Sequence, residues 1–572
     1  MRFRPGAAAV ALWVTWAGAA RAQRVPGTVA CRGQRITAID ITSEAPSVAG
    51  VRRVPVVSEI ARTVHTTTQP QVIRRFLLLK VGDWCAERAR QESERILRAQ
   101  PFLADARILV RPDSGGGVTL DVHTIDEVAL VFSSTLRNRG PLLTGVRLGD
   151  GNTGGEGIYL MSSWWKEAAL RDGYAFNLTD YQFLGRPIQA TVLAARNPLG
   201  GAYYLGVQRP FLTDFQRAAW RVQQGESDDY VRFVDQAGVV HADRLGRTYA
   251  DIGGLARIGA PGRLALVGLS VSHEATRLGA APILVTGQGV APDPGPVLDG
   301  RYDSRSSSRV NLLLGYRNLR FVRATGFDAL RNTQDLPVGV QIGGLIGKSA
   351  PFLGSRGHDM LVGGDVYAGA GWRRAAIRFQ TTGEMRRSLA TNAWDGLLVS
   401  GRLAEYNKIG MRQTVITSLE WGGGWRVRVP FRVTLAGTDG GIRGMPEGRE
   451  QGARRSILRL EDRIDLGSHL GQTADFGLAV FADAGRMWAG DVPFGTTTPV
   501  RYSVGVSLLA AFPAASARMW RLDIAVPNVP GRGPQLALRL SHSDESLTFW
   551  REPRDIAMAR ERSVPASLFN WP

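Results

Sequence analysis

Residues 476–488 read FGLAVFADAGRMW, in which two kinds of side chain alternate. One set of alternating positions is aliphatic: Leu478, Val480 and Ala482. The intervening set carries aromatic, acidic and small residues: Phe481, Asp483 and Gly485. Successive side chains of a β-strand point to opposite faces, so we predict a strand with an apolar outer face and an inner face that holds Asp483.

The same alternation recurs further along the chain, with Gly, Asn, Asp and Pro between the segments. Residues 502–508, 522–526 and 536–540 place tyrosine and aliphatic side chains opposite small or charged ones. Segments of about ten residues with this pattern are typical of a transmembrane β-barrel. The packed core of a soluble β-sandwich or propeller would exclude the inward charges. The fourteen tryptophans suit the aromatic girdles of such a barrel.

Residues 129–550 are therefore expected to form an antiparallel transmembrane barrel in a mainly β protein. At roughly 26 residues per strand and connection, this length predicts about 16 strands, and 14 or 18 would also fit. The last strand is expected to end near Phe549 and Trp550, which leaves residues 551–572 as a C-terminal extension. Three places stay open for that extension: the lumen, the periplasm, or no fixed structure.

A loop motif precedes the opening stretch: Gly441, Ile442, Arg443 and Gly444. A further strand is predicted at residues 455–464, where Arg459, Glu461 and Arg463 share one face. An arginine between glycines is common in surface loops, so the tetrapeptide alone is a weak signal. The acidic residues on the two strands after it make the motif informative.

In combination, these residues resemble those of the outer-membrane assembly factor superfamily. This superfamily comprises BamA/TamA-like proteins of the bacterial surface antigen family, with the two-partner secretion transporters as relatives. Residues 442–444 match its Val/Ile-Arg-Gly-aromatic loop, with Met445 where an aromatic residue is usual. Its Phe-x-Asp-x-Gly strand matches three residues: Phe481, Asp483 and Gly485. The resemblance is specific over residues 437–488 and loose elsewhere.

The resemblance implies that the loop folds back into the barrel, where Arg443 pairs with Asp483 and has Glu461 nearby. A guanidinium group in a narrow lumen needs a carboxylate, and removing one partner of a desolvated pair costs about 3–5 kcal/mol. The glycines on either side allow the backbone to turn tightly and approach the wall.

Residues 33–128 have the pattern of a small α+β domain in the order strand, helix, helix, strand, strand. One helix is expected at residues 71–79, with capping hydroxyls at residues 66–68, and another at residues 86–100, which Pro101 ends. The strands are expected at three places: residues 35–42, 106–110 and 118–122.

Three stretches of this domain resemble a POTRA domain: IRRFLLLKVGD (73–83), ESERILRAQPFLADARI (92–108) and GGVTLDVHTIDE (116–127). In that family the module stands in the periplasm and receives extended substrate strands at a sheet edge, where main-chain hydrogen bonds give affinity. We assign residues 23–128 to the module. A small α+β domain of unrelated role is the alternative, and the connection at residues 43–65 is longer than the family pattern predicts.

The first 22 residues have the pattern of a cleaved secretory signal. Arg2 and Arg4 precede an uncharged apolar stretch at residues 7–20, and residues 20–22 form a small-x-small cleavage site. The stretch is short for a membrane anchor, and no later run of about 18 apolar residues predicts a helical span. We therefore expect an exported protein with its barrel in the outer membrane and its N-terminal module in the periplasm.

Two cysteines, Cys31 and Cys85, lie in the N-terminal module. In an oxidising compartment they form one disulfide or remain as two buried thiols, and the sequence leaves both states open. No histidine or further cysteine lies at ligand spacing, so no metal site is expected.

The chain carries 70 basic and 51 acidic residues, a net charge of +19, and almost all the basic residues are arginine. They are spread along the chain and accompany no nucleic-acid-binding signature, so no nucleic-acid partner is expected. Residues 149–154 satisfy GxGxxG without a strand-to-helix context, which predicts a strand-joining loop. GxSxG and HExxH motifs are missing from the sequence, and we expect no enzymatic activity and no cofactor.

The resemblance implies a protein that assists the insertion of proteins into the outer membrane, or their translocation across it. Its expected partners are outer-membrane lipid and unfolded or extended polypeptides, with a monomeric barrel and accessory periplasmic proteins. A seam between the first and last strands would template an incoming strand. Two alternatives stay open: a pore or channel, and a structural surface protein of the same fold without assembly activity.

Overall fold

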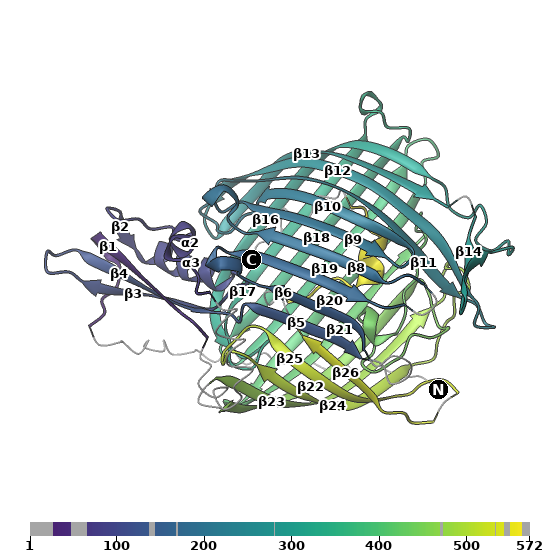
Figure 1. Cartoon of the computed structure of the whole chain (residues 1–572). Helices are drawn as coiled ribbons and strands as arrows, with labels where there is room; N and C mark the ends of the chain where they lie inside the picture. The colour runs from purple at the N-terminus through teal and green to yellow at the C-terminus, as the bar shows by residue number, and fades with distance from the viewer. Residues whose placement is uncertain are drawn as a thin grey trace, which may run out of the picture.

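The computed structural model describes residues 27–46, 66–136, 143–167, 170–279, 281–469, 473–531, 533–542 and 549–562. A small α+β module lies against one end of a closed β-barrel (Figure 1). The predicted signal at residues 1–22 and most of the connection at residues 43–65 lie outside the described residues. Within the described ranges, no helix is both long and apolar enough to cross a bilayer.

The module consists of a four-stranded sheet and two helices. Its elements are β1 (Arg32–Glu44), α2 (Pro70–Phe76), β2 (Trp84–Ala86), α3 (Glu87–Arg98), β3 (Leu103–Pro112) and β4 (Val118–Asp126). The sheet order is β2-β1-β4-β3, with β1 parallel to β4 and the other pairs antiparallel. Alternating aliphatic residues of the sheet, such as Ile108 and Val122, pack in one core with Val72 and Ile73 of α2 and Leu97 of α3.

The helices and strands predicted for the module are present, but several end at other residues. The first helix ends at Phe76 and begins with Pro70, whose ring suits the first turn of a helix. The predicted threonine cap is wrong: Gln69 precedes the helix, and the Thr68 hydroxyl donates to Asp126 Oδ1 (2.8 Å) instead. Strand β2 was not predicted, because three residues are too few to show a period of two.

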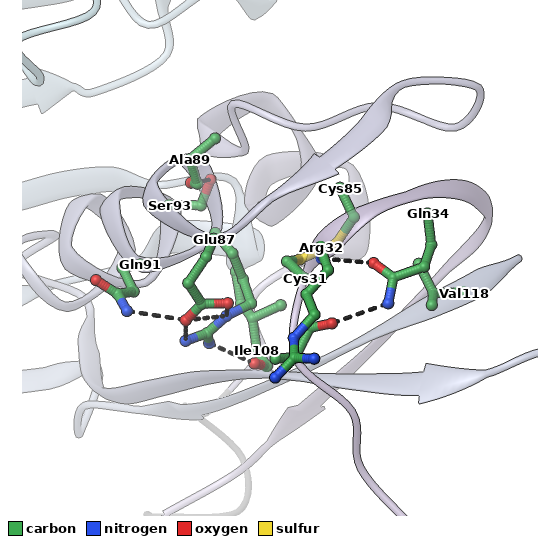
Figure 2. The surroundings of a disulfide bond; sticks show 12 residues. Cys31, Arg32, Gln34, Cys85, Glu87, Ala89, Gln91, Ser93, Ile108 and Val118 are labelled. Atoms are coloured by element: carbon green, nitrogen blue, oxygen red, sulfur yellow. Dashed lines mark hydrogen bonds and ion pairs between the residues drawn. A yellow bond between two sulfur atoms is a disulfide. The ribbon is translucent and has the colours of Figure 1, made fainter.

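Cys31 and Cys85 form a disulfide with their Cα atoms 5.0 Å apart, so the structure has the first of the two states that the sequence leaves open (Figure 2). The bond joins the residue before β1 to the middle of β2. Beside it, Glu87 accepts hydrogen bonds from Arg90 (2.6 Å) and Gln91 (2.8 Å) at the start of α3. The disulfide thus ties the start of β1 to β2, and the Glu87 contacts hold the first turn of α3 beside it.

The barrel is built of antiparallel strands that pair with their neighbours in the sequence. In chain order they are β5 (Leu130–Leu136), β6 (Leu143–Asp150), β7 (Ile158–Trp165), β8 (Gly173–Asp180), β9 (Gln189–Asn197), β10 (Gly200–Arg209), β11 (Ala218–Val234), β12 (Val240–Ala260), β13 (Arg263–Leu278), β14 (Ile283–Thr286), β15 (Gly289–Pro292), β16 (Arg305–Thr325), β17 (Thr333–Ser349), β18 (Asp359–Trp372), β19 (Ala375–Ser388), β20 (Trp394–Ile409), β21 (Gln413–Trp425), β22 (Arg454–His469), β23 (Ala474–Trp488), β24 (Arg501–Ala511), β25 (Met519–Pro527) and β26 (Ala537–His542). The ring closes where β26 lies next to β5.

The predicted fold class is confirmed, but the predicted count of about 16 strands is wrong. In the described residues the ring has 22 strands. Two of them, β14 and β15, form a small hairpin beyond the wall, and β13 pairs directly with β16. A fixed allowance of about 26 residues per strand undercounts this wall. Residues 189–209 alone hold two strands, β9 and β10, joined by a tight turn.

The alternation predicted for residues 476–488 is present in β23. Leu478 and Val480 are 39% and 59% exposed on the outside, while Phe481 and Asp483 are 2% and 1% exposed on the inside. Partly exposed tryptophans lie at the same end of β20, β21 and β23, as expected for an aromatic girdle: Trp394, Trp425 and Trp488. The apolar outer face and the charged inner face are those of a membrane barrel.

The two ends of the barrel have connections of different length. On the module's side the connections include tight turns at residues 261–262, 373–374 and 410–412. On the opposite side they include the long segments 279–304 and 426–453. Short turns at one end and longer loops at the other are the usual asymmetry of outer-membrane barrels.

Helix α3 lies on the rim formed by the short turns (Figure 1). Arg98 of α3 pairs with Asp335 of β17 (2.7 Å), and Arg95 donates to the Leu212 carbonyl in the turn before β11. Residues 149–154, the GxGxxG segment, join β6 to β7 as predicted, and Gln69, the residue before α2, donates to the Gly154 carbonyl (3.1 Å). The module is therefore packed on the barrel by contacts along its helices.

A buried carboxylate anchors the passage from the module to the barrel. Glu127 lies between β4 and β5 and accepts a hydrogen bond from the Ser516 hydroxyl (2.7 Å). Arg518 donates to the carbonyls of Val128 (3.0 Å) and Pro101 (2.8 Å). Burial raises the pKa of Glu127 above its ordinary value. The first barrel strand is thus held to the turn between β24 and β25.

The last strand ends earlier than predicted. Strand β26 ends at His542, and Phe549 and Trp550 lie in no strand. Phe549 is 6% exposed inside the barrel, where the guanidinium groups of Arg378 and Arg402 lie over its ring. An aromatic pair near the end of a barrel sequence suggests a membrane-facing strand, but here Phe549 packs in the lumen.

Candidate functional site

Residues 426–453, which connect β21 to β22, turn into the barrel; we call them the lumen loop. The loop contains one turn of 3₁₀ helix, η5 (Gly437–Asp439). Its Leu435 and Ile442 pack with Ile457 of β22 in one buried cluster, and Ile442 has no exposed surface. Because these apolar side chains are buried against the wall, the loop forms part of the barrel's interior.

Arg443 lies in the middle of the lumen loop and is 8% exposed. Its Nε and Nη2 donate to the two carboxylate oxygens of Asp483 on β23 (2.9 and 2.6 Å). Its Nη1 donates to Glu461 of β22 (2.7 Å), and its backbone N–H also donates to Asp483 (3.0 Å). The guanidinium carbon lies 3.8 Å from the centroid of the Phe481 ring. Bidentate, charge-assisted bonds of this kind fix the side chain and the loop backbone together.

Glycines determine the path of the loop on both sides of Arg443. Gly444 has a φ of 77°, which other residues rarely adopt, and a Cβ there would lie 2.6 Å from the Cβ of Ala525. At Gly441 a Cβ would lie 2.3 Å from the carbonyl oxygen of Leu435. Gly444 thus allows the predicted close approach to the wall, whereas Gly441 allows the loop to pass its own backbone.

The arginine pair belongs to a wider network on the neighbouring strands. Arg459 of β22 donates to Asp483 (3.0 Å) and to the carbonyls of Gly440 and Gly441 (both 2.8 Å). It also pairs with Glu420 of β21 (3.2 Å). Asp483 therefore holds one arginine from the loop and one from the wall.

Glu461 is the second centre of this network. Besides Arg443 it binds Arg463 of its own strand (3.0 Å) and Arg521 of β25 (2.8 Å). Arg521 in turn pairs with Asp523 (2.6 Å). The network thus crosses the inner wall from β21 to β25, and its buried charges are paired as a desolvated group requires.

The lumen loop also contacts the last strand of the barrel. Arg539 of β26 donates to the carbonyl of Gly437 (2.7 Å). A Cβ on Gly444 would lie 3.2 Å from the Cβ of Ala537, so the loop backbone passes close to β26 there. The loop therefore connects β22 and β23 with β26, the strand at which the ring closes.

Residues 549–562, which we call the lumen tail, occupy another part of the interior. They contain the short helix α4 (Arg554–Ala559), whose Ile556 has no exposed surface. A Cβ on Gly422 of β21 would lie 2.2 Å from Cδ1 of Ile556, so this glycine makes room for the tail. Of the three places left open for the C-terminal extension, its described part lies in the lumen.

Ion pairs and carbonyl contacts hold the lumen tail on the wall. Glu561 pairs with Arg309 of β16 (2.5 Å). Arg247 of β12 donates to the carbonyls of Arg560 (2.8 Å) and Ala559 (3.2 Å). These partners come from long strands on the side of the barrel away from β26.

The loop and the tail meet inside the barrel. Arg455 of β22 donates to the Thr434 carbonyl of the loop (2.5 Å) and pairs with Asp555 of the tail (2.6 Å). Ile442 of the loop and Ile556 of the tail belong to the same buried apolar cluster. The two segments therefore fill the middle of the lumen together.

The structure brings together Arg443, Glu461, Phe481 and Asp483 from the predicted site, with Gly441 and Gly444 beside them. Gly485 leaves space for Ile442, since a Cβ there would lie 3.3 Å from its Cδ1. The disulfide Cys31–Cys85 lies apart from these residues, in the module. Sequence reasoning missed several arginines and the contacts of the tail: Arg459 as a second partner of Asp483, Arg521, Arg539, Arg309 and Arg247. Alternation places Arg521 and Arg539 on inner faces, but it names no partner for them.

Across the residues that the structure describes, no group of three or more His, Cys, Asp or Glu side chains could hold a metal ion. The chemistry available in the lumen is that of hydrogen bonds, ion pairs and apolar contacts.

No protein-family model and no curated protein matches the chain. Among solved structures, BamA from Haemophilus ducreyi lacking POTRA domains 1–3 is similar over 89% of this chain and 84% of its own, with 13% identity and a TM-score of 0.34. CdiB from Escherichia coli is similar over 89% of this chain and 75% of its own, with 11% identity and a TM-score of 0.38. CdiB from Acinetobacter baumannii is similar over 89% and 73%, with 12% identity and a TM-score of 0.37.

Proposed function

We propose that this chain is an outer-membrane barrel that assists the insertion of proteins into the outer membrane, or their translocation across it. In this proposal residues 1–22 are an export signal and residues 23–128 are a POTRA-like module in the periplasm. Residues 129–550 supply the barrel, and residues 551–572 are a C-terminal extension whose described part lies in the lumen. The short turns on the module's side support this orientation.

The observation that carries the proposal is that the ring closes between its first and last strands, β5 and β26. The described parts of β26 and β5 have six and seven residues. These two strands are not joined by a turn of the chain, so the wall can open between them while every hairpin stays intact. A substrate strand would pair there by β-augmentation.

The module supplies a second surface for extended polypeptide. Strand β3 lies at one edge of its sheet, in the order β2-β1-β4-β3. Along this edge, side chains of α3 bind backbone groups of β3: Glu94 accepts from the Ile108 N–H, and Arg90 and Arg98 donate to the carbonyls of Ile108 and Ala106. A substrate strand would displace these side chains and pair with the groups that they release. In this proposal the module delivers substrate to the rim on which it packs. The lumen loop keeps β26 near β22 and β23 while the seam opens and closes.

A disulfide across the seam tests this function. Cysteine at Phe132 of β5, combined with cysteine at Leu538 or Leu540 of β26, should lock the seam on oxidation. The purified variant is placed in lipid vesicles, and the folding rate of a small outer-membrane protein into those vesicles is measured. We expect the parent to accelerate folding, the locked variant to lose the acceleration, and a reductant to restore it.

A matched lock at an internal pair is the control. Leu508 of β24 and Leu522 of β25 lie opposite each other, and a disulfide between them should leave the acceleration unchanged. The parent treated with reductant controls for loss of the Cys31–Cys85 bond. If the parent gives no acceleration, or if the seam lock has no effect, the proposed function is wrong. The structural surface protein then remains, or the channel if the parent conducts ions.

A further inference from the structure

A groove of about 1010 Å³ lies between helix α3 and the outer side of the barrel at the rim. Its floor is formed by the ends of β16 and β17 nearest the module, with Tyr316, Val340 and Ile342. These side chains point outward and are 38–45% exposed. Arg88 and Gln91 of α3 line the groove from above. The groove therefore has a membrane-facing floor and a polar overhang.

The outer face of β16 changes character within the groove. Leu312 and Leu314 are 40% and 44% exposed on the part of the strand that faces hydrocarbon, and Tyr316 follows them. The next outward residues are Asn318 and Arg320, both exposed. A change from aliphatic through tyrosine to polar side chains marks the boundary between hydrocarbon and headgroups. Helix α3 lies over this boundary.

The groove has a surplus of positive charge. Its three carboxylates already have arginine partners: Glu92 with Arg95 (2.9 Å), Asp214 with Arg317 (3.0 Å) and Asp335 with Arg98 (2.7 Å). Arg88 donates only to the Pro261 carbonyl (2.6 Å) and has no carboxylate partner among the described residues. Arg320 has no hydrogen bond or ion pair to any described residue.

We propose that this groove binds one anionic phospholipid of the membrane leaflet next to the module. Arg88 and Arg320 hold the headgroup phosphate, because guanidinium groups donate several N–H bonds to phosphate oxygens. The glycerol and the first part of an acyl chain lie on Tyr316, Val340 and Ile342. The inference rests on the proposed placement of the barrel in the outer membrane, but not on its assembly activity.

Charge and shape favour a phospholipid over a free anion. An inorganic phosphate would use the arginines but would leave the outward side chains of β16 and β17 uncovered. An amphiphile matches both parts of the groove, since its headgroup and chains meet at the same boundary as Arg320 and Tyr316. A net negative headgroup also balances the two arginines that have no carboxylate.

Native mass spectrometry of the full chain in detergent tests the proposal. Phosphatidylglycerol, phosphatidylethanolamine and inorganic phosphate are added in separate titrations. We expect one bound phosphatidylglycerol that survives mild activation, with weaker binding of phosphatidylethanolamine and no competition from phosphate. Replacing Arg320 by Gln should weaken the tight binding about five-fold, as expected for one arginine near a headgroup.

Arg209→Gln is the matched control, because Arg209 is an exposed arginine at the rim end of β10 and does not line the groove. If Arg209→Gln and Arg320→Gln lose the same amount of lipid, the binding is general to the barrel surface and the proposal is wrong. Displacement of the lipid by phosphate would reduce the site to an anion site and would also overturn it. Arg88→Gln should reproduce the effect of Arg320→Gln, and the heat-dependent gel shift of each variant verifies folding.

This measurement is independent of the seam. Failure of the seam lock would remove the assembly function but leave the lipid titration unchanged. Failure of the lipid titration would leave the folding assay unchanged. The two proposals can therefore be rejected separately.

Discussion

Two sides of the barrel differ in how they are held together. In the described residues, strands β24–β26 and β5–β10 have 6–11 residues each, whereas the wall strands from β11 to β23 have 13–21. The lumen loop packs where the two sides meet, against β22, β23 and β26, and the lumen tail packs mainly inside the long-stranded side. We call the first the seam side and the second the far wall.

The difference indicates that backbone pairing and side-chain ion pairs contribute to stability in different proportions on the two sides. A long antiparallel pair such as β16 and β17 has a ladder of 17 residue pairs, while β25 and β26 share six. Where the seam side meets the far wall, ion pairs of Arg443, Arg459 and Arg521 join the lumen loop, β22, β23 and β25. The far wall is stable through its own ladder, and its lumen tail closes the interior.

Removing the lumen tail should have the largest effect. Deletion of residues 549–572 takes Phe549, α4 and Glu561 out of the lumen, and water and ions should enter along the far wall. Planar-bilayer recordings should change from little conductance to open-pore steps. Deleting the hairpin at residues 283–292 is the control, because it lies beyond the wall and should leave conductance unchanged. Equal conductance of the truncated and parent proteins would contradict the role of the tail.

Replacing Arg443 by Ala should have the next largest effect, confined to the wall from β22 to β26. The change leaves Asp483 and Glu461 with fewer partners in a buried network, and we expect the free energy of unfolding in detergent to fall by about 3–5 kcal/mol. Amide hydrogen exchange should become faster in β22–β26 and stay unchanged in β12 and β16. Equal acceleration on both sides would show that the two regions are not held separately.

The control for the fall in the free energy of unfolding is a substitution in an arginine–carboxylate ion pair on the surface. Arg277 and Glu226 lie 2.5 Å apart, and their side chains are 61% and 42% exposed. Arg277→Ala should cost no more than about 1 kcal/mol, because solvent screens exposed pairs.

Gly444→Ala should have the smallest effect of the three. Its φ of 77° strains an alanine, and the added Cβ would meet Ala525, so we expect a loss of about 1–3 kcal/mol in the free energy of unfolding. Gly448→Ala is the control, because a Cβ there has no neighbour within 4 Å. If both variants unfold alike, close approach of the loop to β25 does not stabilise the seam side.

The sequence predicted the parts of the structure that depend on local pattern. Alternation was enough for the outer and inner faces of β23, because membrane and lumen impose opposite preferences on neighbouring residues. The contact of Arg443 with Asp483 and Glu461 came from a family resemblance over residues 437–488. The fold class could therefore be predicted from little more than the two-residue alternation of apolar and polar side chains.

Features that depend on distant residues could not be predicted in this way. The number of strands was wrong because the strands range from four residues in β14 to 21 in β12, and no average length represents both. The pair of Glu561 with Arg309 joins residues 252 positions apart. Phe549 looked like the end of a strand because an aromatic residue suits both a membrane boundary and a cluster of guanidinium groups.

The position of the lumen tail after β26 has a consequence for how the protein is made. Every strand of the wall precedes the tail in the chain, so each is synthesised before it. The lumen loop, in contrast, arrives before β22 and is available while the wall is still growing. When the barrel closes, the lumen loop is therefore already present. The interior beside the far wall is filled only when the lumen tail enters.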